Sequence, residues 1–423
     1  MPQTSIPTDT LNVIHANAAG LDVHKMQITA TVRLARPGGE AEVRTGAFSA
    51  LPSGLAELTV WLARHQVTAA VMEATGVYWE AVFDALESAG IEPIVVHAQH
   101  VKQIKGRKTD VADSIWLARI CQFGLCTPSF IPPAEFRELR KLSRQRRKVV
   151  RLRATVRTRI HQVIDGAGVR VGGLLSDVLG ANGRRILDGL AAARPPQDIL
   201  ASLSHHVRPR LGELCDALDG SLSTQARFIL NDQLDAFDRA GERIAAYDAF
   251  IHERLTPYRE RIDLLTTLPG VDQASAAAIF IELGPDIGVF PSARQCAAWA
   301  GLCPGNNESA GKRRAGTTRK GNTFLRSLLV ECAQGAARTG DCQFKGYHKA
   351  LTVRRGYKRA TVATAHKMLR CIHAMLNHGN VYRDPQTDYE ALMAKRNAPR
   401  WIAMLKKHGL SPADFSPRKP VAA

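Results

Sequence analysis

Four acidic residues in the first 113 positions have the spacing and the surroundings of a catalytic set. Asp22 lies in "AAGLDVHK" and Glu73 in "AAVMEATG", and both segments are otherwise apolar. A carboxylate in a buried segment is costly unless it is paired or binds a metal. Asp110 and Asp113, in "GRKTDVADSIWLAR", are three positions apart and so share one face of a helix. For any one of these acids alone, a helix cap or a surface ion pair is the ordinary explanation.

Together, the four acids predict a metal site, on the condition that the fold gathers them. Carboxylates that converge repel one another, so the cluster is stable only around cations. Ligand sets made of oxygen atoms favour Mg²⁺ or Mn²⁺. Two such ions can hold a scissile phosphate and stabilise the attacking and the leaving oxygen.

The order of the elements around these acids favours an RNase H-like domain. The hydrophobic pattern predicts two strands within residues 17–34, a third in 41–50, a helix in 53–65 and a strand in 67–76. A helix in 77–90, a strand in 91–98 and a helix from near Thr109 follow. In an RNase H-like sheet the first and fourth strands are parallel neighbours about 4.8 Å apart, which would place Asp22 beside Glu73. Other α/β layouts share this order of elements.

A long basic helix is expected from Glu135 onward. Between Arg137 and Arg159 the chain has eleven lysines and arginines and a single acid, Glu138. Charged runs are usually solvated, but so one-sided a run favours an anionic partner such as a phosphate backbone. The candidate nucleic-acid-binding residues in and before this helix are Lys108, Arg140, Arg144, Arg147 and Arg151.

Heptad spacing predicts that this helix pairs with a second one. Leu142, Val149, Val156 and Val163 are seven positions apart, as are the apolar residues of a second helix expected at about 221–261. Glycine- and proline-containing stretches interrupt the chain between the two helices. We therefore expect an antiparallel coiled-coil hairpin, which serves as a spacer or as a dimer contact.

The C-terminal half contains a second group of candidate site residues. "LTTLPGVDQASAAAIFIELG" fits a helix-hairpin-helix with Gly270 in a turn that faces a phosphate, and it fits an ordinary αα-hairpin equally well. An exposed loop is expected at 301–321, with Ser309 in "NESAGKRR". A loop serine most often bonds only to the backbone. The cations of this loop that would neutralise phosphate are Lys312, Arg313, Arg314, Arg319 and Lys320. The tail beyond Tyr382 is polar and is expected to be loosely ordered.

Composition favours a nucleic-acid partner. The 423 residues include 57 lysines and arginines against 39 acids, a net charge of +18, which suits binding to a polyanion.

No apolar run approaches the ~20 residues of a membrane span, and no signal-peptide pattern is present. The eight cysteines form no CxxC pair, which favours free thiols in a reducing compartment. We expect a cytoplasmic protein, and the family resemblance given below implies a bacterial one associated with the nucleoid.

The acids and the serine loop together resemble a known family. The order Asp22, Glu73 and then D-x-x-D in "KTDVADSIWLARI", followed by "WAGLCPGNNESAGKRRAGTTRKGNTFLRSLLVECA", is similar to the DEDD transposases and invertases of the insertion sequence 110 family, which are related to the Piv DNA invertase. The resemblance covers roughly residues 16–125 and 260–345. It implies a RuvC-like domain that binds divalent metal through the four acids, and a nucleophilic serine at Ser309. It also implies a structured bridge RNA that pairs with donor and target DNA, and a multimer with composite sites.

These observations lead to one expected organisation and function. We expect an α/β RNase H-like (RuvC-like) domain at 1–130, a coiled-coil region at 131–262, an all-α domain with the serine loop at 263–385 and a polar tail at 386–423. The expected function is an RNA-guided DNA recombinase that uses Mg²⁺ or Mn²⁺ and acts as a homo-oligomer, a dimer to a tetramer. The alternatives are a RuvC-like nuclease that cuts with activated water, and an inactive nucleic-acid-binding scaffold.

Overall fold

The chain divides into two compact units. A computed structural model describes residues 12–36, 40–74, 76–97, 110–218, 222–305, 308–309, 312–313, 318–340 and 342–410. The units are Met1–Ala134 and Glu135–Ala423, and each is described by itself below. The finer division into four parts stays a prediction.

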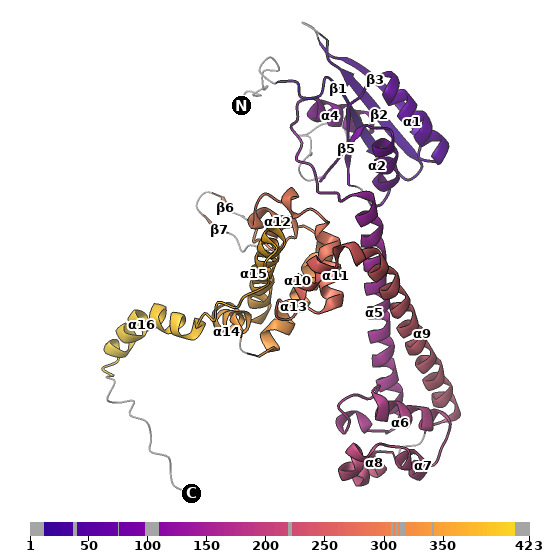
Figure 1. Cartoon of the computed structure of the whole chain (residues 1–423), viewed down its shortest axis with the longest axis vertical. Helices are drawn as coiled ribbons and strands as arrows, with labels where there is room; N and C mark the ends of the chain where they lie inside the picture. Colours follow the sequence, from indigo (N-terminus) through magenta and orange to yellow (C-terminus); the bar gives the residue numbers. More distant parts are fainter. Residues whose placement is uncertain are drawn as a thin grey trace. The chain divides into compact units, whose positions relative to one another are not determined.

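The first unit is built on a five-stranded sheet (Figure 1). Its strands are β1 (Asn17–Val23), β2 (Gln27–Leu34), β3 (Glu42–Ser49), β4 (Ala69–Glu73) and β5 (Glu92–Val96). They lie in the order β3-β2-β1-β4-β5. β1 pairs antiparallel with β2 and parallel with β4, and β4 pairs parallel with β5. This is the RNase H-like order, so the predicted fold class is confirmed.

Helices cover both faces of this sheet. α1 (Pro52–Arg64) and α2 (Trp79–Ser88) pack on one face, where Leu21, Leu58 and Leu86 are buried together. α4 (Asp110–Gln122) packs on the other face, against Ala18 and Val71. Because side chains alternate along a strand, residues 18, 20 and 22 of β1 belong to the face that α4 covers.

The second unit begins with the predicted helical hairpin. α5 (Ala134–Gly166) and α9 (Thr224–Leu255) run side by side (Figure 1). Arg146 donates hydrogen bonds to Asp248, and the Arg153 guanidinium lies 4.0 Å from the centre of the Phe237 ring. A later residue of α5 thus meets an earlier residue of α9, which confirms the antiparallel pairing.

Short helices connect the end of α5 to the start of α9. For this connection the sequence indicated only residues that interrupt a helix. The short helices are η2 (Val171–Gly173), α6 (Ala181–Ala191), α7 (Pro196–Ala201), η3 (His205–Arg210) and α8 (Leu211–Ala217). Ile160, Ile186 and Leu230 are among the residues of their shared apolar core. This end is therefore a small packed body rather than an irregular connection.

The rest of the second unit is almost entirely helical. The elements after α9 are η4 (Thr256–Tyr258), α10 (Arg259–Thr266), α11 (Gln273–Leu283), η5 (Ile287–Val289), α12 (Ala293–Trp299), β6 (Glu308–Ser309), β7 (Lys312–Arg313), α13 (Thr323–Arg338), α14 (Gln343–Arg355), α15 (Tyr357–His378) and α16 (Tyr389–Lys407). α15 has fully buried Ala365, Met368 and Ile372. Among the described helices, no helix combines the length and the apolar character that crossing a membrane requires.

The expectation of a loosely ordered tail beyond Tyr382 is wrong for the described part. α16 spans Tyr389–Lys407. Its first residue packs on the preceding helices, since the Tyr389 ring lies 5.4 Å from the Tyr347 ring and the Lys367 ammonium lies 4.8 Å from the centre of the Tyr389 ring. Aromatic contacts of this kind come from residues distant in sequence, so the polar composition of the tail did not reveal them.

Candidate active site

Gly20 lets α4 lie directly on β1. A Cβ atom added at Gly20 would overlap the carbonyl oxygen of Ser114 and the amide nitrogen of Ala118. A glycine is therefore required where the helix backbone comes this close. Asp22 follows two residues later on the same face of β1, so the first turn of α4 lies near its carboxylate.

Polar contacts hold α4 in this position. The hydroxyl groups of Thr31 on β2 and Ser114 on α4 are 2.7 Å apart and buried. At the other end of the helix, Arg33 donates a hydrogen bond of 2.6 Å to the side chain of Gln122, whose amide donates to the carbonyl oxygen of Ala16. Both ends of α4 are thus fixed to the sheet.

The parallel pairing of β1 with β4 places Glu73 level with Asp22. The paired residues are Ala18 with Ala69 through Leu21 with Met72, so Asp22 and Glu73 occupy the next position on each strand. Both belong to the face that α4 covers. The prediction that these two acids lie on neighbouring parallel strands is confirmed.

Asp110 and a histidine complete the described cluster. The imidazole Nε2 of His24 lies 3.3 Å from a carboxylate oxygen of Asp22 and 3.7 Å from one of Asp110. Potential ligand atoms of Asp22, His24 and Asp110 all lie within 4.8 Å of one another. His24 was not among the predicted site residues. The signal that would have found it is its position two residues after Asp22, on the turn that leaves the same strand.

The electrostatics of the cluster fit a cation. Burial raises the pKa of Asp22 above its usual value, and the carboxylates of Asp110 and Asp113 raise it further, while His24 lowers it. Acids that oppose one another's ionisation are stabilised by a divalent ion. Asp22, Asp110 and His24 are the residues that would hold it, with Asp113 and Glu73 beside them. His24 adds a nitrogen to a ligand set that was expected to consist of oxygen alone. Lys108 lies outside the described residues.

Ser309 is placed in a short hairpin rather than in an open loop. β6 and β7 pair antiparallel, with Ser309 opposite Lys312 and Glu308 opposite Arg313. At the base of the hairpin, the amide of Arg319 donates to the carbonyl oxygen of Cys303, and Pro304 and Thr318 form a further bridge. Arg319 and Lys320 are exposed. Arg314 and the side chains of Ser309, Lys312 and Arg313 lie outside the described parts.

Comparison with known proteins identifies the family. A model of the DEDD-type IS110 proteins, described as "Transposase", matches residues 19–168, and a second, described as "Transposase IS116/IS110/IS902 family", matches residues 262–349. The chain belongs to the IS110 family of transposases. The first match contains all four predicted acids, and the second contains Ser309. Membership in a DEDD family with this fold implies that the transposase depends on a divalent metal.

Curated relatives agree over most of the chain. The transposase for insertion sequence element IS1111A of Coxiella burnetii is 26% identical, over 76% of this chain and 81% of its own length. A probable family 20 transposase of Pseudomonas aeruginosa is 28% identical, over 74% and 85%. Among solved structures, Thermus thermophilus RuvC is similar at 16% identity and a TM-score of 0.22, covering 26% of this chain and 99% of that one. The RNase H-like fold follows from the strand order rather than from this last likeness.

In the transposase, several predicted phosphate-binding arginines of α5 have partners inside the protein. Arg140 and Arg144 form ion pairs with Glu282, and Arg147 pairs with Glu331. Carboxylates of α9, α11 and α13 thus balance part of the charge of this helix, and phosphate binding by Arg140, Arg144 and Arg147 stays a prediction. Arg151 is exposed and remains a candidate for phosphate contact.

Gly270 is in the predicted helix–turn–helix, but it faces another helix. It has a φ of +80°, and a Cβ added there would overlap the backbone of Cys332 and Ala336 on α13. Asp272 caps α11 by accepting a hydrogen bond of 2.8 Å from the amide of Ser275. A carboxylate thus occupies the helix start that a phosphate would need. The structure favours the ordinary αα-hairpin, with Gly270 as a packing residue.

Proposed function

We propose that the transposase is an RNA-guided DNA recombinase that joins donor and target DNA through a covalent bond to Ser309. The observation that carries this proposal is the combination, in one chain, of the acidic cluster around Asp22 with a serine on a hairpin whose neighbouring residues are cationic. Neither feature alone would favour recombination over hydrolysis.

The chain's residues divide the chemistry between them. Asp22 and Asp110, with His24, Glu73 and Asp113, would hold divalent ions, which stabilise negative charge on a phosphate when bound. The Ser309 hydroxyl loses its proton as its oxygen forms a bond to phosphorus, the bond from phosphorus to one DNA oxygen breaks, and that oxygen takes up a proton to become a free hydroxyl group. Lys312, Arg313 and Arg314 neutralise the phosphate. A hydroxyl group of the second DNA then displaces serine, so the phosphodiester is conserved.

Exposed cations outside the cluster would bind the nucleic acids. Arg151 lies on α5, and Arg319 and Lys320 lie at the base of the hairpin. A net charge of +18 suits simultaneous binding of a guide RNA and two DNA duplexes. We further propose that the transposase works as a homo-oligomer, a dimer to a tetramer, with Mg²⁺ or Mn²⁺.

Two other functions predict different products. A RuvC-like nuclease would use water and leave free phosphate ends with no protein attached. An inactive scaffold would bind nucleic acid and cleave no strand, but such a protein has no need for two further carboxylates that raise the pKa of the half-buried Asp22.

The test of guidance is to change the RNA. The protein is purified with its RNA, the RNA is sequenced, and the complex is supplied with donor DNA, target DNA and Mg²⁺. Changing the RNA segment that is complementary to the target should move the insertion site to the matching sequence. Recombination at the original site without RNA would contradict RNA guidance.

A further inference from the structure

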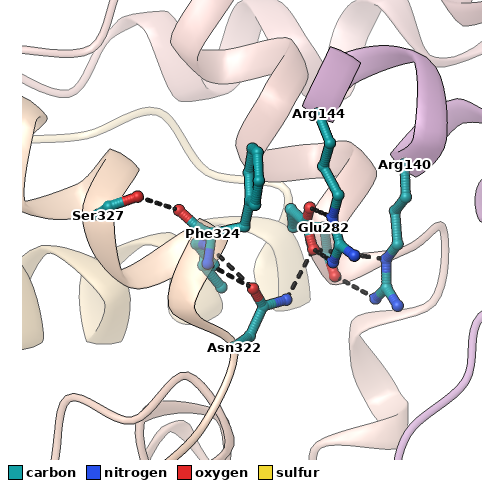
Figure 2. Close-up of polar contacts among 7 residues, drawn as sticks. Arg140, Arg144, Glu282, Asn322, Phe324 and Ser327 are labelled. Carbon is teal, nitrogen blue, oxygen red and sulfur yellow. Dashed lines mark hydrogen bonds and ion pairs between the residues drawn. The ribbon is translucent and has the colours of Figure 1, made fainter. Parts of the chain in front are cut away.

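A buried carboxylate in the second unit connects α5 with the start of α13. Glu282, in the last turn of α11, is 1% exposed. Figure 2 shows it between two arginines of α5 and the residue that precedes α13. Arg144 donates two hydrogen bonds to its carboxylate, of 2.8 and 2.9 Å. Arg140 donates to its main-chain oxygen, and the amide group of Asn322 donates a hydrogen bond of 2.6 Å to the carboxylate. A charge this buried depends on all of these partners.

Asn322 connects Glu282 to the end of the serine-bearing segment, residues 300–322. Its side-chain oxygen accepts hydrogen bonds from the amides of Phe324 and Leu325 and so caps α13. Its side-chain nitrogen is the group that donates to Glu282. One residue therefore fixes both the start of α13 and the point at which the chain returns from the β6–β7 hairpin.

The start of the serine-bearing segment is tied to this network as well. The main-chain amide of Asn322 donates a hydrogen bond of 3.0 Å to the carbonyl oxygen of Trp299, the last residue of α12. The Arg140 guanidinium lies 5.7 Å from the centre of the Trp299 ring. Farther along the segment, the amide of Arg319 donates to the carbonyl oxygen of Cys303. The two ends of the segment are thus held together, and both are held to Glu282.

We infer that Glu282 is a positioning residue for Ser309, which sets the base of the hairpin through Asn322. This inference rests on the proposed serine mechanism. Displacement of a reacting group by about 1 Å can cost roughly a hundredfold in rate, so a nucleophile on a two-stranded hairpin needs a fixed base. Glu282 contacts no part of the hairpin strands that the structure describes, and it acts through its neighbour.

The substitution Asn322→Asp tests this role with little change to helix capping. Aspartate caps a helix as well as asparagine does, so α13 keeps its start. The new carboxylate cannot donate a hydrogen bond to Glu282 and repels it. We expect covalent attachment of DNA at saturating DNA concentration to slow by roughly tenfold to a hundredfold, with DNA affinity within about twofold of the wild type. Amide hydrogen exchange at Arg319 and Asn322 should become faster.

A second variant and a control separate positioning from general stability. In Glu282→Gln with Asn322→Asp, the glutamine amide can donate to the aspartate, so the hydrogen bond is restored with the opposite polarity. We expect this double variant to recover most of the rate that Asn322→Asp loses, as coupled sites do. Ser223→Asp also places an aspartate at a helix N-cap, that of α9, and it should leave the rate unchanged.

The possible outcomes are distinct. Attachment by Asn322→Asp at the wild-type rate would overturn the positioning role, whatever happens to the melting temperature. Equal loss of rate in the single and double variants would also overturn it. If the wild type itself attached no DNA at Ser309, the proposed function would fail, and this inference would fail with it.

Discussion

At the scale of residues, the acids could be predicted and their neighbours could not. Asp22 and Glu73 were recognisable because a charge in an apolar run needs a partner. Glu282, in "AAAIFIELG", gives the same signal, but its partners Arg140 and Arg144 lie far away in sequence. Gly20 gives no signal, since its role depends on the helix backbone that packs on it. Single glycines and distant ion pairs are features of packing, which a sequence pattern does not contain.

Substitution of Gly20 should separate α4 from the sheet. Gly20→Ala and, more strongly, Gly20→Val would overlap the backbone of α4, and overpacking of this kind costs about 1–3 kcal/mol. We expect a lower unfolding free energy in denaturant titrations and weaker Mn²⁺ binding, because Asp110 moves away from Asp22. Gly166→Ala, where an added Cβ would meet no atom within 4 Å, is the control. Unchanged Mn²⁺ affinity in Gly20→Val would contradict this role of the glycine.

Asp22→Asn should have opposite effects on stability and on activity. The pKa of Asp22 is raised in the folded state, so its ionised form opposes folding once the pH exceeds the unfolded value. Without metal at neutral pH, Asp22→Asn should therefore melt at an equal or higher temperature than the wild type. With Mn²⁺ the wild type should gain stability, by about 2.7 kcal/mol when the Mn²⁺ concentration is a hundred times the dissociation constant, and the variant should not.

Asp22→Asn should also abolish strand cleavage while RNA binding is retained. Asp113→Asn should have the same effect on cleavage. Recombination at the normal rate by either variant would exclude this metal site.

At the scale of elements, the sequence predicted the helical hairpin but not which of its charged residues form ion pairs within the protein. Heptad spacing correctly indicated that α5 and α9 pair. The ion-pair partners of the α5 arginines come from α9, α11 and α13 and from Asp177, which precedes α6, so a count of charges along one helix overestimated the unpaired ones. Gly270 shows the same limit, since the turn was recognisable but the helix that it faces was not.

Neutralising exposed cations of α5 should weaken nucleic-acid binding. Lys148, Arg151 and Arg159 are exposed, and their replacement by glutamine should lower the slope of log affinity against log salt by about 0.9 for each phosphate of duplex DNA that is no longer neutralised. Filter binding at several salt concentrations measures this slope. In the control variant, glutamine replaces three arginines that form ion pairs within the protein, Arg146, Arg157 and Arg184. An equal effect of both triple variants would mean that only net charge matters.

At the scale of the whole molecule, the candidate chemistry is divided between two units. The acids belong to the first unit and Ser309 to the second. The family could be predicted because each half has its own motif. The oligomer could not be derived from the residues, because heptads suit both a spacer within one chain and a contact between chains.

Mixing two inactive variants tests whether protomers share a site. Asp22→Asn keeps the serine, and Ser309→Ala keeps the acids. If the acids of one protomer act on DNA with the serine of another, mixed oligomers contain a complete site, and recombination should return in part. If each chain forms its own site, the mixture should stay inactive, and the proposal of composite sites would be wrong.

The most direct test of the serine mechanism is denaturing electrophoresis of the transposase with its RNA and labelled donor and target DNA, with and without Mg²⁺. We predict a DNA-shifted protein band that requires Mg²⁺, that yields a phosphoserine peptide containing Ser309 after nuclease digestion, and that is absent in Ser309→Ala. That variant should still bind RNA and DNA. A shifted band that persists in Ser309→Ala would move the nucleophile elsewhere, and full recombination by Ser309→Ala would contradict the serine mechanism.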